Sequence, residues 1–92
     1  MIDDLILKLK KEIISKLNLE TMTPEQIDAE APLFGEGLGL DSVDGLELVV
    51  LLEENYGIKV RDRQEGSKIF RSIKTMAEYI EYILDHQKKQ SP

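Results

Sequence analysis

The chain contains no cysteine, no tryptophan and one histidine among its 92 residues. Without cysteine there is no disulfide framework, no thiolate nucleophile and no cysteine-ligated zinc site. The histidine, His86, stands in a polar C-terminal stretch, so the sequence gives no credible Ser-His-Asp arrangement. Nothing in the pattern indicates two carboxylates buried together as a general acid and base. These absences argue against an enzyme.

Long apolar runs are also missing. The longest, residues 48–52, is far too short to cross a membrane, so we expect no membrane insertion. The N-terminus is acidic, with no basic segment before an apolar one, and a cytoplasmic protein is the expectation. The length suits one small domain with one modest core. We expect that domain to span 1–85 and a polar tail to follow over 86–92.

Acidic residues outnumber basic ones, and the formal net charge is −6. This balance argues against nucleic acid as a partner, because nucleic-acid binding needs a basic face. It suits a protein that meets basic surfaces on its partners. The alternative is that the acidic excess only keeps a small domain soluble.

Apolar residues near the N-terminus recur at helical spacing and predict an amphipathic helix that ends near Asn18. They are Ile2, Leu5, Ile6, Leu9, Ile13 and Leu17. The periodicity then fades over residues 19–40, which we expect to form a long loop anchored by Ile27, Leu33 and Phe34. Within this loop, 23–26 has the signature of a short helical turn, with a threonine cap, a proline at the first position and a glutamine as capping partner.

A second helix is predicted from Ser42 to Tyr56. Asp41 is a good N-cap candidate, Asp44 is its reciprocal partner three residues on, and Gly57 indicates the C-cap.

Residues 61–85 predict a loop, then a short helix or turn, and then a long last helix. Residues 61–66 are polar and predict a loop, and 67–72 predict a brief third helix or turn around Ile69 and Phe70. A last helix is expected from Ile73 or Lys74. Its apolar face comprises Met76, Ala77, Ile80, Ile83 and Leu84. The sum is an all-α fold, a small antiparallel four-helix bundle with three long helices and one short one, and a long loop between the first two helices.

The most informative stretch is Gly39-Leu40-Asp41-Ser42-Val43-Asp44. Asp and Ser are common at helix starts for capping reasons, so the stretch could simply begin a helix. A phosphate esterified to Ser42 would, however, lie beside the unpaired N–H groups of a first helical turn, where an anion is favoured. The preceding glycines would allow the backbone of a modifying enzyme to approach closely.

This stretch resembles the Asp-Ser-Leu attachment motif of acyl carrier proteins, with Val43 in the Leu place. The resemblance is strongest over 33–60. It implies that a phosphopantetheinyl transferase uses coenzyme A to attach a 4′-phosphopantetheine arm to Ser42, with Asp41 contacting the transferase. The arm would hold acyl groups as thioesters for acyl-transferring, condensing and modifying enzymes. The protein itself would be a monomer and not a catalyst.

The second helix has more apolar surface than one core-facing stripe needs. The residues expected in the core are Gly45, Leu48, Val49, Leu52 and Tyr56. The residues expected to bind partners are Val43, Asp44, Glu47, Val50 and Glu54, and in the family this helix is the main recognition surface. The alternative is that the two valines pack under the long loop. The resemblance further suggests that the bundle shelters part of the acyl chain, with lining candidates Leu33, Phe34, Leu48, Leu52 and Ile80.

The same residues allow other interpretations. Asp41, Asp44 and Glu47 do not form a calcium loop, because leucines interrupt the ligand spacing, and we expect no metal. A peptidyl or aminoacyl carrier would use the same chemistry, and an unmodified helical interaction module is a further alternative.

Two segments depart from typical fatty-acid carriers. Residues 61–63 are Arg-Asp-Arg where further acids are usual, and 70–73 are Phe-Arg-Ser-Ile. Residues 35–40, together with Ser72 and Ile73, are similar to specialised carriers of arylpolyene-type and other secondary pathways. These features argue against a housekeeping role in fatty-acid synthesis.

Overall fold

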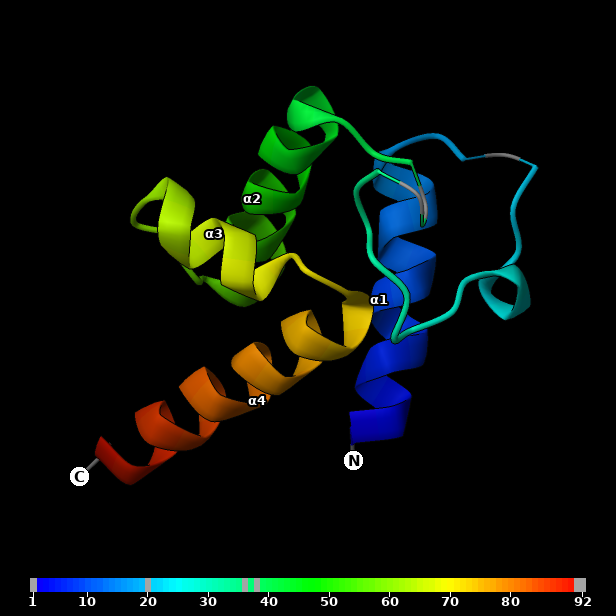
Figure 1. The fold of residues 1–92 in the computed structure, drawn as a ribbon. Coiled ribbons are helices and arrows are strands. Elements are labelled where there is room, and N and C mark those ends of the chain that lie inside the picture. The colour runs from blue at the N-terminus through cyan, green and yellow to red at the C-terminus, as the bar shows by residue number, and fades with distance from the viewer. Residues whose placement is uncertain (1, 20, 36, 38, 91–92) are drawn as a thin grey trace.

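The computed structural model describes residues 2–19, 21–35, 37 and 39–90. Four α-helices and one short 3-10 helix are the regular elements in these ranges: α1 (Ile2–Lys16), η1 (Pro24–Gln26), α2 (Ser42–Tyr56), α3 (Arg63–Ile69) and α4 (Ile73–Gln90). Figure 1 shows α1 and α2 running in opposite directions, with α4 crossing the base of the bundle obliquely. The predicted all-α bundle with three long helices and one short one is confirmed.

The core lies where α1, α2 and α4 meet. Each long helix contributes its apolar stripe, and the largest fully buried side chains are Leu9, Ile13, Leu33, Leu48, Leu51, Leu52, Ile73, Met76 and Ile80. Leu48 and Leu52 were expected here, whereas Val49 and Tyr56 are only partly buried against the cluster. Leu51 was not expected in the core. It is buried because α2 packs against α1 on that side, which widens its apolar stripe.

The prediction for the third helix was wrong at its start. Residues 61–66 were expected to be a loop, but α3 begins at Arg63. Asp62 is its N-cap, since its Oδ1 accepts a hydrogen bond from the backbone N–H of Glu65 at 2.8 Å. The helix was missed because it is short and mostly polar, with Ile69 its one fully buried side chain among those described.

The last helix begins at Ile73, as predicted, but it does not end where the polar tail was expected. It continues through residue 86 as far as Gln90. Of its predicted apolar face, Met76, Ala77 and Ile80 are buried, while Leu84 is 38% exposed because α4 runs beyond the bundle (Figure 1). No helix in the described part of the chain is long and apolar enough to span a membrane.

The long loop between α1 and α2 is fastened to the bundle at several points. Its short turn η1 has the expected capping partner, since the Gln26 side chain accepts from the Thr23 N–H at 2.9 Å. The expected anchors Ile27 and Leu33 are buried, and Phe34 is partly buried. The backbone N–H of Leu33 donates to the carbonyl of Arg71 at 3.1 Å. The loop therefore holds the start of α2 against the junction between α3 and α4.

Candidate functional site

The start of α2 is fixed by a reciprocal cap. Asp41 Oδ1 accepts from the backbone N–H of Asp44 at 3.1 Å, and Asp44 Oδ2 accepts from the backbone N–H of Asp41 at 3.0 Å. Both predicted roles are confirmed. The cap does not use the side chain of Ser42, which is exposed at the first residue of the helix. An exposed hydroxyl therefore stands at a helix N-terminus of defined geometry.

Three glycines, at positions 35, 37 and 39, precede the helix. Gly35 and Gly39 have φ angles of 69° and 77°, a region that favours glycine. At Gly37 a Cβ would collide with the carbonyl oxygen of Pro32. The backbone N–H of Leu40 donates to the carbonyl of Leu33 at 3.0 Å. Leu40, itself buried, thus sets the position of the residues that follow it.

Gly45 lies in the second turn of α2, facing Phe34 of the loop. A Cβ built on Gly45 would sit 3.5 Å from Cε1 and Cζ of the Phe34 ring, which is ordinary van der Waals contact. The close packing of loop on helix accounts for a small residue here without making glycine obligatory.

The outer face of α2 is apolar at its centre. Val43 is 64% exposed and Val50 is 38% exposed, so neither valine packs under the loop. Leu46, which is 66% exposed, lies between them and was missed by sequence reasoning. Its signal was available, since positions 43, 46 and 50 share one helical face.

The acidic side chains predicted beside this face differ from one another. Asp44 is partly buried and engaged in the cap, and Glu47 is partly buried. Glu54 is exposed but already paired, since its Oε1 lies 3.2 Å from Nζ of Lys16 on α1. Glu54 therefore also helps join α1 to α2, a role that the sequence did not reveal.

The residues expected to line a shelter for an acyl chain are packed together. Leu33, Leu48, Leu52 and Ile80 are each at most 1% exposed, and Phe34 is partly buried beside them. They belong to one contiguous cluster contributed by the loop, α2 and α4.

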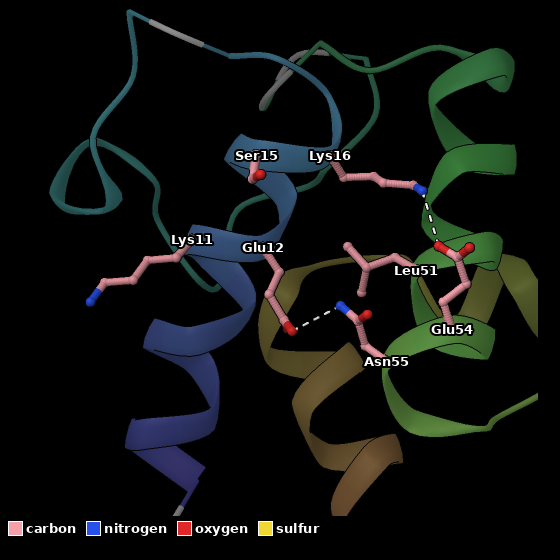
Figure 2. A pocket seen from close by; sticks show the side chains of 7 residues that line it. All are labelled: Lys11, Glu12, Ser15, Lys16, Leu51, Glu54 and Asn55. Atoms are coloured by element: carbon pink, nitrogen blue, oxygen red, sulfur yellow. Dashed lines mark hydrogen bonds and ion pairs between the residues drawn. The ribbon is translucent and has the colours of Figure 1, made fainter.

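A surface hollow of about 300 Å³ lies between α1 and α2, and Leu51 is one of the residues that line it (Figure 2). Its rim is bridged by the Lys16–Glu54 ion pair and by a 2.9 Å hydrogen bond from Asn55 to Glu12. The polar groups of this hollow hold the two helices together. Within the described residues no group of three or more potential ligands could hold a metal ion.

Comparison with known proteins places this geometry in a family. The model of the phosphopantetheine attachment site family matches residues 8–80, a range that contains the α2 start. The chain is 36% identical over 75 residues to an acyl carrier protein of Wolinella succinogenes, covering 82% of this chain and 87% of the relative. It is 37% identical over 76 residues to an acyl carrier protein of Akkermansia muciniphila, covering 83% and 88%. A third acyl carrier protein, from Thermosynechococcus vestitus, is 31% identical over 80 residues, covering 87% and 88%. The chain therefore belongs to the acyl carrier protein family, whose members bear a covalent phosphopantetheine group and act as carriers rather than catalysts.

Proposed function

We propose that Ser42 is the residue that carries the phosphopantetheine arm. The observation that supports this most directly is an exposed hydroxyl at the first residue of α2, beside a cap that does not use it. The first-turn N–H groups of a helix have no carbonyl one turn earlier to bond, and the helix dipole favours an anion there. These features fit the phosphodiester that would link the serine to the arm.

The arm supplies a terminal thiol, on which acyl groups are held as thioesters. This chain's own residues would do the rest. Asp41 fixes the helix start and, as an exposed carboxylate, contacts the phosphopantetheinyl transferase. Gly35, Gly37 and Gly39 carry no side chain and so leave room for that enzyme to approach the backbone before Ser42.

The outer face of α2 would bind the transferase and the acyl-transferring, condensing and modifying enzymes of the pathway. Exposed Val43, Leu46 and Val50 offer contact area. The nearby carboxylates of Asp44, Glu47 and Glu54 steer basic partners. The protein would act as a monomer in these encounters.

The pathway we favour is a specialised one, of arylpolyene type, rather than housekeeping fatty-acid synthesis. The support is the likeness of residues 35–40, with Ser72 and Ile73, to such carriers. The chain also departs from typical carriers over 61–63 and 70–73, where Arg61 and Arg71 are exposed.

Intact mass spectrometry tests the attachment site. The full chain is incubated with coenzyme A and a broad-specificity transferase, and we expect its mass to rise by one phosphopantetheine. Ser42→Ala should gain nothing, whereas Ser15→Ala, which removes another exposed hydroxyl, should be modified like the wild type. Modification of Ser42→Ala at the wild-type rate would place the arm elsewhere.

A further inference from the structure

Charge is distributed unevenly along this chain. Residues 59–74 contain six of its twelve Lys and Arg residues and only two acids, a formal charge of +4, so the remaining residues together carry −10. The six cations are Lys59, Arg61, Arg63, Lys68, Arg71 and Lys74. The segment surrounds α3 and follows directly on the acidic helix α2.

The two acidic residues of this segment already form hydrogen bonds within the protein. Asp62 caps α3 through the N–H of Glu65, and Glu65 accepts a hydrogen bond from the Tyr79 hydroxyl at 3.3 Å. Lys68 shares a surface hollow with Glu65 and Glu78, which partly offsets its charge. Lys59, Arg61 and Arg71 are exposed. In the part of the chain that the structure describes, the two ion pairs use Lys16 and Lys74, so neither involves these three cations.

The lysines of α1 differ from these cations in how far their charge is balanced by neighbouring groups. Lys16 is paired with Glu54, and Lys8 Nζ lies 5.3 Å from the centre of the Tyr56 ring. Acids are also interspersed among them at positions 3, 4 and 12. The cations of α1 are therefore largely balanced within the molecule, whereas those around α3 are not.

We propose that Lys59, Arg61, Lys68 and Arg71 form a second docking surface, which binds an acidic surface on a partner protein. We refer to these four residues as the α3 cations. The argument is charge complementarity. A partner that binds the acidic helix α2 presents basic residues to it. Basic residues of the same partner opposite the α3 cations would weaken binding, because like charges in contact cost affinity. A cognate partner therefore carries carboxylates there. Identifying that partner as a pathway enzyme rests on the proposed function, but the charge preference of the surface does not.

The test is an amide NMR titration of the full chain with two capped peptides, decaglutamate and decalysine. Decaglutamate should shift the resonances of residues 59–74, and decalysine those of α2. Replacing two cations, Lys59→Gln with Arg61→Gln, should weaken decaglutamate binding about three- to tenfold, as expected for two exposed charge contacts. The matched pair Lys10→Gln with Lys11→Gln removes the same charge from α1 and should change binding less than about twofold.

Three outcomes would overturn the proposal. Equal weakening by both pairs would mean that only overall charge matters. Concentration-dependent shifts of residues 59–74 and of α2 in the free chain, without any peptide, would mean that α3 instead meets α2 of a second copy. Binding to phosphatidylglycerol vesicles through the same residues, without site-specific decaglutamate shifts, would assign the surface to a membrane. Modification of Ser42 in each variant is measured in parallel. A failure of the proposed attachment site is therefore distinguished from a failure of the proposed docking surface.

Discussion

The hydroxyl of Tyr56 donates a hydrogen bond to Oε1 of Glu12 over 2.6 Å. The other carboxylate oxygen of Glu12 accepts from Asn55 at 2.9 Å. One side chain in the middle of α1 thus holds the last turn of α2, while the reciprocal cap holds the first. Because α2 is fixed at both ends, its outer face keeps a constant shape for partners.

Removing the phenol hydroxyl should weaken this contact without disturbing the core. Tyr56→Phe is expected to lower the free energy of unfolding by about 0.5–1.5 kcal/mol, the net value of one hydrogen bond. Urea denaturation at pH 8 measures it. Asn55 can still bond Glu12, so a loss much larger than this would contradict the limited role given to the tyrosine.

The same variant has a distinctive pH dependence. Burial, and then the Glu12 carboxylate, raise the pKa of Tyr56 above its ordinary value of 10.0. A raised pKa gives stability that is fully present below pH 10 and is lost as pH rises toward the folded-state pKa. The stability advantage of the wild type over Tyr56→Phe should therefore shrink above pH 10. A constant difference between pH 8 and pH 11 would contradict the assignment.

Asp41 combines a capping role with a proposed recognition role, and two substitutions separate them. Asp41→Ala should lower stability by about 0.5–2 kcal/mol, because the N–H of Asp44 loses its acceptor. Asp41→Asn keeps an acceptor and should keep stability, but it removes the charge and should slow modification by the transferase. If Asn lowers stability as Ala does while modification is unchanged, the recognition role is wrong.

Local signals explain what the sequence could predict. The start of α2 follows from Asp41 and Asp44, and its end from Gly57, whose φ of 67° confirms the left-handed C-cap. The burial of Leu51 was not predictable from helix periodicity alone, because it depends on how closely α1 approaches. The start of α3 was missed although Asp62 and Glu65 have capping spacing, since a polar seven-residue helix lacks apolar periodicity. The extent of α4 was underestimated because polar residues at a chain end were interpreted as a tail.

Gly45 within α2 and Gly57, which caps its end, should respond to alanine in opposite directions. Gly45→Ala should stabilise the protein by about 0.5–1 kcal/mol, because alanine favours helix and its methyl would meet the Phe34 ring at ordinary contact distance. Gly57→Ala should destabilise it by about 1–2 kcal/mol, because Gly57 is left-handed. Thermal unfolding compares them. If Gly45→Ala is more stable but is modified more slowly, the glycine serves access to Ser42 as well as packing.

Neighbouring residues on α2 provide the sharpest test of its two faces. Val50 is 38% exposed and Leu51 is 2% exposed, although they are adjacent in sequence. Val50→Asp should therefore leave helicity by circular dichroism nearly unchanged while raising the Michaelis constant of the transferase. Leu51→Asp should unfold the domain, because an unpaired carboxylate would be buried against α1. Transferase turnover of the wild type should also fall as salt rises, since ions screen exposed charges beyond about 8–10 Å. If Val50→Asp unfolds the protein as Leu51→Asp does, Val50 belongs to the core and the outer face of α2 is not the docking surface.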